Sequence, residues 1–276
     1  MLRVLHVELL PVEEVPLYTI CPGCLALRAI VPGGGFPCAE CLWSEYNDVD
    51  VELTKPLTVD VLRDKLAITR AEVVVVDGPD PLASMGVDAV CSVLDGVEAV
   101  RVVKTLGLSV EPRVDCVDAL VVDLSGLVAS EKPRGFTRVY DTLARLAGSV
   151  HVELLFPYVR RGLKSVLVDI VSRYDMPVTV VPLEELFEEA YRVVDALRKE
   201  GRPVYLHGDT SYTLLDVFCT SCRTVLVERR PWGVKRRYEP PVRPSRVRCP
   251  SCGSLQPLLD ARPVKRPKLR RRVVVY

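Results

Sequence analysis

The chain has 276 residues, of which 49% are hydrophobic, and its 37 Lys and Arg nearly balance its 36 Asp and Glu. At roughly 100–200 residues per domain, this length predicts a large domain with a small one, and the composition excludes a disordered or low-complexity protein. No apolar run approaches the ~20 residues that cross a bilayer, and the amino terminus lacks the plan of a signal peptide. We therefore expect a soluble, cytoplasmic protein that does not contact membranes. These features do not indicate its oligomeric state.

Short Val-rich runs alternate with amphipathic stretches through most of the chain. We predict strands at 27–31, 71–77, 98–104, 119–124, 150–156, 177–181 and 203–207, and helices at 58–68, 81–94, 136–147, 161–174 and 183–200. The strand starts lie about 20–30 residues apart, which is the spacing of βαβ units and of a parallel sheet. The sequence thus predicts an α/β fold, a partial (β/α)6-type parallel barrel, with a small zinc ribbon at its carboxyl-terminal end. Enzymes built on parallel barrels carry their sites at the carboxyl ends of the strands.

The pattern changes near residue 208, where a turn-rich stretch is followed by many Pro and Arg residues without helical periodicity. We place a domain boundary there. The predicted organisation is an amino-terminal segment with a cysteine metal site and the first barrel strand (1–56), the rest of the barrel (57–207), a zinc ribbon (208–260) and a basic tail (261–276). The tail contains prolines, and we expect an extended arm.

Ten cysteines in a chain without a signal peptide indicate metal binding rather than disulfides. Eight of them form four Cys-x2-Cys pairs, which are Cys21/Cys24, Cys38/Cys41, Cys219/Cys222 and Cys249/Cys252. The remaining two, Cys91 and Cys116, stand alone in apolar surroundings, and we predict that they are small core residues.

The two carboxyl-terminal pairs have the spacing of a zinc ribbon. Cys219 and Cys222 are separated by 26 residues from Cys249 and Cys252, and Gly253 follows the last cysteine. Each pair forms a tight turn that directs two sulfurs to one point, and glycine permits the backbone geometry of such a turn. Four thiolates make a closed tetrahedral shell, so we predict a structural zinc whose binding contributes folding energy on the order of 10 kcal/mol.

The two amino-terminal pairs allow two interpretations. By spacing, Cys21, Cys24, Cys38 and Cys41 predict either a second zinc site or an iron–sulfur cluster, which also takes cysteine thiolates. The spacing does not decide between these metals.

The segment Gly33–Trp43, with Phe36, Cys38 and Cys41, resembles the cluster loop of radical SAM enzymes related to pyruvate formate-lyase activating enzyme, including the archaeal AmmeMemoRadiSam group. That loop reads Cys-x3-Cys-x2-Cys after the first barrel strand. The resemblance continues through Gly78-Pro79-Asp80-Pro81, at the place of Gly-Gly-Glu-Pro, and through Val117–Gly126, which is similar to a strand ending in Val-Asp-Leu-Lys-Gly. It covers roughly residues 18–256.

This resemblance implies a [4Fe–4S] cluster, S-adenosylmethionine (SAM) beside Asp80 and Asp123, and a protein substrate. Three positions depart from the pattern: Gly34 replaces the first cysteine, Asp80 a glutamate and Ser125 a lysine. Two outcomes follow. Either Cys21 or Cys24 supplies the third thiolate and SAM binding survives, or all four cysteines close around a zinc or a cluster and catalysis is lost. We expect the second outcome, with the four cysteines converging on one metal centre.

A second function class follows from charge. Residues 201–276 hold 17 Lys and Arg against 5 Asp and Glu, whereas the remainder of the chain is acidic. A basic end attracts phosphates whatever their sequence. The alternative is therefore a non-catalytic zinc-ribbon protein that binds nucleic acid through residues 229–272, with Trp232 and Tyr238 as the aromatics placed for base stacking.

Overall fold

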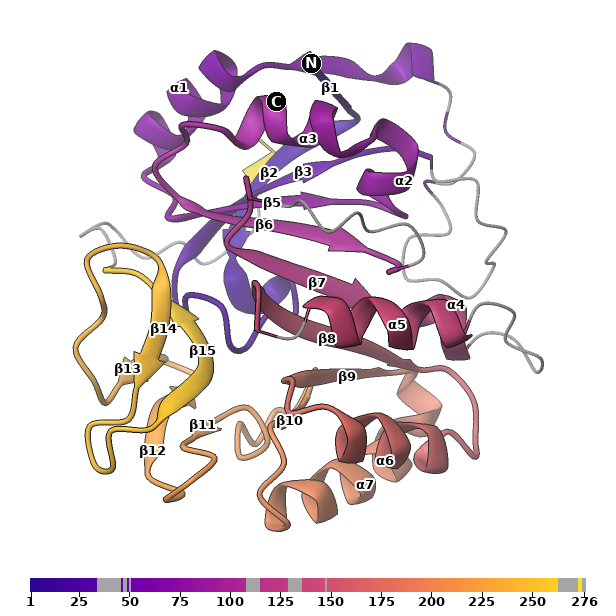
Figure 1. Cartoon of the computed structure of the whole chain (residues 1–276), viewed down its shortest axis with the longest axis vertical. Coiled ribbons are helices and arrows are strands. Elements are labelled where there is room, and N and C mark those ends of the chain that lie inside the picture. Colours follow the sequence, from indigo (N-terminus) through magenta and orange to yellow (C-terminus); the bar gives the residue numbers. More distant parts are fainter. Residues whose placement is uncertain are drawn as a thin grey trace.

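The computed structural model describes residues 1–33, 46, 49, 51–107, 115–128, 136–146, 148–262 and 273–274. Their largest element is a nine-stranded sheet of order β10-β9-β8-β7-β6-β5-β3-β2-β16 (Figure 1). Its strands are β2 (His6–Pro11), β3 (Leu25–Ile30), β5 (Val73–Asp77), β6 (Val100–Thr105), β7 (Ala119–Asp123), β8 (His151–Tyr158), β9 (Val178–Pro182), β10 (Val204–Leu206) and β16 (Val273–Val274).

The strands from β3 to β10 are parallel and follow one another in chain order. The sheet is edged by β10 and β16, so it is an open, partial barrel, and the predicted α/β fold is confirmed. The strands β3 and β5 are buried along their whole length, as expected for a sheet that is covered on both faces.

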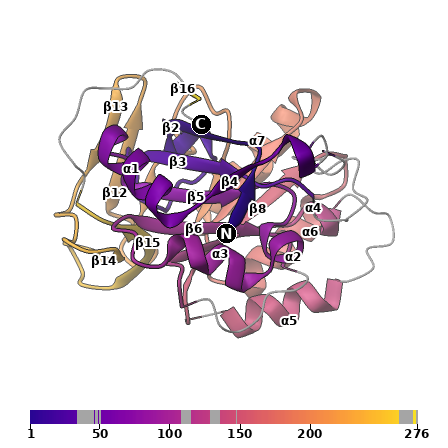
Figure 2. The ribbon, with the colours of Figure 1, turned by 90° about the horizontal axis from the view of Figure 1, so that it is seen from above.

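The helices cover one face of this sheet. They are α1 (Val59–Thr69), α2 (Pro81–Met85), α3 (Val87–Leu94), α4 (Ser125–Val128), α5 (Phe136–Leu146), α6 (Lys164–Arg173) and α7 (Phe187–Lys199), with short 3-10 turns at Val12–Glu14, Val51–Leu53 and Glu184–Leu186. Successive right-handed crossovers place their helices on the same side, and one large apolar cluster joins them to the sheet (Figures 1 and 2). None of these described helices is long and apolar enough to cross a membrane.

The sequence patterns found the parallel strands to within a few residues, but the antiparallel edge was missed. β2 pairs antiparallel with β3, β16 pairs antiparallel with β2, and β1 (Leu2–Val4) pairs with β4 (Lys55–Leu57). Of these strands, β16 lies within the predicted basic tail, where Val273–Val274 adds a strand to the sheet edge.

The opposite face of the sheet, its inner face, is covered by the chain between β2 and β3. We call residues 12–24 the strap. The side chains of Val12, Leu17 and Ile20 pack with Val75, Val102 and Val121 of the strands in a second apolar cluster. The strap thus covers the inner face of the sheet, and the helices cover the other face.

A buried carboxylate fixes the strap. Glu153 of β8 is fully buried, and its oxygens accept hydrogen bonds from the backbone amides of Tyr18 (3.0 Å) and Thr19 (3.1 Å) and from the hydroxyls of Thr19 and Thr179 (both 2.7 Å). Burial raises the pKa of Glu153, and the four hydrogen bonds act in the opposite direction. Two of the donors are backbone amides, which need an acceptor wherever they are buried away from water.

Residues 217–260 form the ribbon, which lies at the end of the sheet where the parallel strands begin (Figure 1). It consists of β11 (Val217–Phe218), β12 (Val225–Arg230) and β13 (Gly233–Arg236) in one sheet, and β14 (Ser245–Arg248) and β15 (Leu255–Asp260) in another. A third apolar cluster joins ribbon residues to Tyr18 of the strap and Tyr205 of β10. The strap therefore connects the ribbon to the sheet.

Glu153→Gln tests the role of the buried carboxylate. Either orientation of the amide places its NH2 group against a backbone amide donor, so we expect a loss of about 3 kcal/mol in the free energy of unfolding, measured in urea. Thr179→Val is the matched control, since it removes one hydroxyl donor and leaves both amides satisfied, at about 1 kcal/mol. Equal losses in the two variants would contradict the assignment of Glu153 as the anchor of the strap.

Candidate metal centre and charged end of the sheet

The four carboxyl-terminal cysteines converge, as predicted from their spacing. The sulfurs of Cys219, Cys222, Cys249 and Cys252 all lie within 4.8 Å of one another. The Sγ atoms of Cys219 and Cys252, and those of Cys222 and Cys249, are 3.6 Å apart. Tetrahedral zinc with Zn–S bonds of about 2.3 Å needs sulfurs about 3.8 Å apart, so this cluster fits zinc.

Each pair lies in a turn of the same construction. The amide of Arg223 donates to the carbonyl of Cys219, and the amide of Gly253 donates to the carbonyl of Cys249. Both residues adopt the left-handed region, with φ of 63° at Arg223 and 74° at Gly253. Glycine adopts this region without strain, whereas an arginine does so at some cost.

Hydrogen bonds prepare one of these thiols for metal binding. Burial of Cys219 raises its pKa, but bonds from the Ser254 hydroxyl and from the amides of Cys222 and Ser221 outweigh this effect and lower the pKa to about 6. Burial has the opposite result at Cys249, where it raises the pKa to about 11. A bound zinc ion would hold all four sulfurs as thiolates.

The amino-terminal cysteines differ from the prediction in part. Cys21 and Cys24 lie in the strap and are joined to each other by a disulfide, although together with Asp260 they form a group whose ligand atoms lie within 4.8 Å. The oxygens of Asp260 already accept hydrogen bonds from Arg236, Tyr238 and the Ala261 amide. A cation there would share the Asp260 carboxylate with Arg236, and the three residues stay a possible metal site.

Cys38 and Cys41 lie outside the described residues, so the predicted convergence of all four cysteines stays a prediction. The described chain adds one constraint. Cys24 directly precedes β3, and the segment with Cys38 and Cys41 comes after the other end of that strand. A strand of six residues spans roughly 20 Å, so the two pairs leave β3 at opposite ends.

The remaining two cysteines are a correction to the sequence analysis. Cys91 of α3 and Cys116, which precedes β7, are joined by a disulfide across 25 residues of sequence. Both pack against the core, as predicted, but they are bonded to each other rather than isolated. Their distance in the sequence concealed that α3 and the start of β7 are neighbours.

At the carboxyl end of the sheet, five charges of alternating sign lie side by side on the inner face. Each comes from one of five adjacent strands, and together we call them the charge ladder: Asp123 (β7), Lys104 (β6), Asp77 (β5), Arg28 (β3) and Glu8 (β2). All five are at most 5% exposed. The distances between oppositely charged atoms run from 2.9 to 3.3 Å along the ladder.

Each cation of the ladder contacts two carboxylates. Lys104 Nζ lies 3.3 Å from Asp77 and 3.2 Å from Asp123, while Arg28 bridges Asp77 and Glu8. Burial of Asp77 raises its pKa, but Lys104 and Arg28 outweigh burial and hold the pKa below its usual range. Of this set, only Asp123 is among the site residues predicted from the sequence. The signal for the others is a charged residue within a largely apolar strand, as Arg28 in LALRAI and Lys104 in VRVVKT.

The two predicted cofactor residues lie at this same end. Asp80 caps α2 and accepts hydrogen bonds from the amides of Ala83 and Leu106 and from the Thr105 hydroxyl. Burial raises its pKa. Asp123 accepts from Lys104 and from the amide and hydroxyl of Ser125. Both carboxylates therefore have partners within the protein.

Gly78 brings the ends of β3 and β5 together at this edge. Its φ is 136°, and a Cβ atom added there would lie 2.1 Å from the carbonyl oxygen of Val31. Only glycine fits so close to another backbone. This explains the glycine in Gly78-Pro79-Asp80-Pro81 without reference to a ligand.

A cavity of about 180 Å3 lies between the strap and the ladder. Its lining includes Arg28, Asp77 and Lys104 from the ladder, Leu17 from the strap, and His207, whose Nδ1 lies 2.9 Å from the Tyr18 hydroxyl. Ligand pockets commonly measure about 300–1,000 Å3, so this cavity is small.

No protein-family model matches the chain, and the search of curated proteins found no match either.

Cys249→Ser tests the carboxyl-terminal metal site. We expect it to lose about one equivalent of zinc, measured by metal analysis of the purified protein, and to make residues 217–260 sensitive to protease, because binding and folding of the ribbon are linked. Cys91→Ser is the control and should keep its zinc. Unchanged zinc content in Cys249→Ser would exclude the site.

Lys104→Met tests the ladder. It leaves two buried carboxylates facing each other and should lower the free energy of unfolding at neutral pH by about 3–5 kcal/mol, measured in urea. Arg101→Met, which breaks the more exposed pair of Arg101 with Asp118, should cost about 1 kcal/mol or less.

The same variant should change the pH dependence of stability. The lowered pKa of Asp77 stabilises the folded state above the usual value of 3.8, and this contribution is lost as the pH falls below it. Without Lys104 the pKa of Asp77 rises, so stability should be lost at a higher pH. If the Lys104→Met variant unfolds in acid at the same pH as the unmodified protein, Lys104 does not stabilise the charged form of Asp77.

Proposed function

We propose that this protein is a divergent radical-SAM-like metalloprotein that no longer cleaves SAM, and whose ribbon holds a structural zinc. The proposal is supported by the sequential parallel sheet and by the position of the Cys38/Cys41 segment, which follows β3, the first parallel strand. It is the position at which the resembling enzymes carry their cluster loop.

The sequence supports the loss of a cluster that opens to SAM. Such a cluster needs three thiolates, and Gly34 stands where the resembling enzymes have the first cysteine. The Cys21 and Cys24 sulfurs are bonded to each other at the start of β3, whereas the segment with Cys38 and Cys41 follows the end of that strand. We therefore derive no radical step for this chain.

The charge ladder is the observation that carries the proposal. A SAM site needs a cation for the carboxylate of the ligand and a carboxylate for its amino group. Here Arg28 and Lys104 are each held between two carboxylates, and Asp80 and Asp123 accept hydrogen bonds within the protein. The end of the barrel is thus filled by interactions that stabilise the fold. The small adjoining cavity supports the same conclusion.

A second proposal, nucleic-acid binding by residues 229–272, is favoured by Trp232. This side chain is 75% exposed on the turn between β12 and β13, in a hairpin that also carries Lys235 and Arg237. Tyr238 does not share this role, because it is partly buried and donates a hydrogen bond to Asp260. Part of the positive charge is also neutralised, since Arg230 and Arg237 pair with Glu228.

Anaerobic reconstitution with iron and sulfide tests the first proposal. After addition of dithionite and SAM, we expect no more 5′-deoxyadenosine from the unmodified protein than from the Cys38→Ser/Cys41→Ser variant, while zinc in the ribbon is retained in both. Formation of 5′-deoxyadenosine that this variant abolishes would overturn the claim of lost catalysis.

Cys21→Ser extends the same experiment to the shared centre. If all four amino-terminal cysteines hold one metal, this variant and Cys38→Ser should lose the same metal equivalent. If the pairs are separate, only the change at Cys38 should alter the metal content or the visible spectrum.

A further inference from the structure

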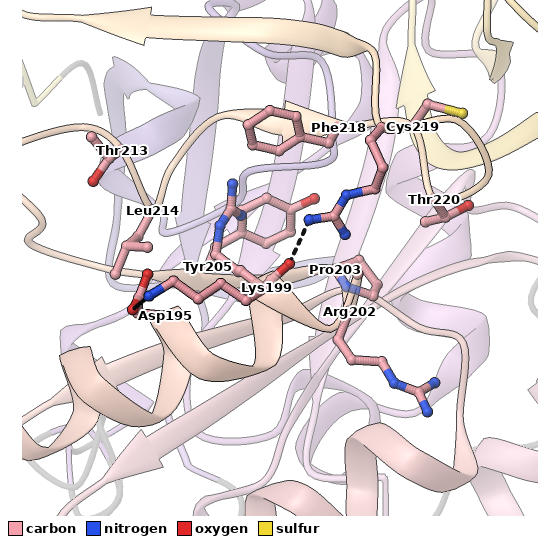
Figure 3. A pocket seen from close by; sticks show the side chains of 13 residues that line it. Asp195, Lys199, Arg202, Pro203, Tyr205, Thr213, Leu214, Phe218, Cys219 and Thr220 are labelled. Atoms are coloured by element: carbon pink, nitrogen blue, oxygen red, sulfur yellow. Dashed lines mark hydrogen bonds and ion pairs between the residues drawn. The ribbon is translucent and has the colours of Figure 1, made fainter.

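A second cavity, of about 210 Å3, lies at the other end of the sheet, where the ribbon meets the barrel. It is bounded by the last turn of α7, by the segment that leads into β10, and by the turn of residues 219–223, which carries Cys219 and Cys222 and which we call the zinc knuckle (Figure 3). The figure shows Asp195 and Lys199 on the helix, Tyr205 and Phe218 behind them, and Cys219 and Thr220 on the knuckle. Neither the ladder nor the zinc site accounts for this cavity.

The lining is strongly cationic. It includes four basic side chains, those of Arg198, Lys199, Arg202 and Arg223, and one carboxylate, that of Asp195. Asp195 pairs with Lys199 at 2.6 Å. Arg202 lies 3.7 Å from Asp175, which is fully exposed, so this pair is weak. The cavity keeps an excess of positive charge.

Arg198 forms the floor of the cavity. It is 9% exposed, and its guanidinium donates to the carbonyl oxygens of Val204 (2.9 Å) and Asp216 (2.7 Å) and stacks against Tyr205 and Phe218. These acceptors are neutral. Burial lowers the pKa of Arg198, Tyr205 and the Asp216 carboxylate act in the opposite direction, and the cation of Arg223 lowers the pKa further. A buried cation that contacts dipoles and aromatic faces would gain from a nearby anion.

Arg223 is held at the entrance by the zinc knuckle. It follows Cys222 in the left-handed region, and its Nη2 atom donates to the carbonyl of Arg198 at 2.7 Å. Its Nη1 atom lies where a side chain at Gly201 would be, since a Cβ added there would approach it to 2.8 Å. The absent side chain at Gly201 thus leaves the space that the guanidinium occupies. A folded ribbon fixes this second cation beside the first.

We propose that this cavity binds a phosphate group, as a monoester or diester, between Arg223 and the surface above Arg198. Guanidinium groups match phosphate oxygens with paired hydrogen bonds. The Thr213 hydroxyl lines the same cavity, and Phe218, which contacts Arg198 through its ring, lines it as well. This site is independent of the proposed function, because it lies at the opposite end of the sheet from the ladder.

Isothermal titration with a nucleoside monophosphate and with the matching nucleoside tests this site. We expect the monophosphate to bind and the nucleoside not to bind. Arg223→Gln should weaken the binding by about tenfold, the loss expected for charge-assisted hydrogen bonds. Arg202→Gln, at the rim, should weaken it less. Arg243→Gln removes an exposed charge elsewhere on the ribbon and should leave the affinity unchanged.

A single-stranded oligonucleotide separates the two sources of phosphate. If the cavity takes a backbone phosphate, Arg223→Gln should weaken both ligands. If it takes a free nucleotide only, oligonucleotide binding should depend on Trp232 and not on Arg223. Zinc content and thermal unfolding of each variant establish that it is folded. No binding of either ligand, or equal losses in Arg223→Gln and Arg243→Gln, would overturn the proposal.

Discussion

The position of the strap on the inner face of the sheet is the constraint on which the rest of this structure depends. A parallel sheet must be covered on both faces, and the helices cover only one. Glu153 accepts four hydrogen bonds that hold Tyr18 and Thr19 against β8 and β9. The carbonyl of Thr19 accepts a hydrogen bond from the amide of Leu259, and the carbonyl of Leu259 accepts one from the amide of Cys21. These two bonds align β15 of the ribbon beside the strap. The carbonyl of Tyr18 also accepts from Arg229 of β12. The buried carboxylate of Glu153 therefore contributes to the position of the ribbon, because it fixes the part of the strap that the ribbon contacts.

The two ends of the sheet carry different chemistry as a result. At the carboxyl ends, three carboxylates alternate with two cations across five strands, beside a small cavity. At the amino ends, the ribbon and the end of α7 bring several cations together with a single carboxylate. Buried charges that pair with one another form part of the fold, whereas an excess of positive charge attracts an anion. In this chain the excess of positive charge lies at the amino ends of the strands, and the paired charges lie at the carboxyl ends, where enzymes built on parallel barrels carry their sites.

The turn that holds Cys219 and Cys222 also affects the surface beside the four-cysteine cluster. The left-handed residue that completes the first Cys-x2-Cys turn is Arg223, where the second turn has Gly253. An arginine at that position is directed by the geometry of the turn onto the end of α7. Metal binding would then also position a cation, and the ribbon would be part of a site as well as a structural module.

Much of the architecture is determined by the sequence itself. The alternation of Val-rich strands with amphipathic helices and the spacing of Cys219, Cys222, Cys249 and Cys252 predicted the parallel sheet and the ribbon, because hydrophobic period and cysteine spacing are local properties. The charge ladder, the strap and the Cys91–Cys116 disulfide depend on which distant residues become neighbours. Charged residues in separate strands, such as Arg28 and Lys104, have no opposite charge beside them in the local sequence. Only the order of strands in the sheet decided that they pair with carboxylates, because it places side chains that are distant in the chain next to one another.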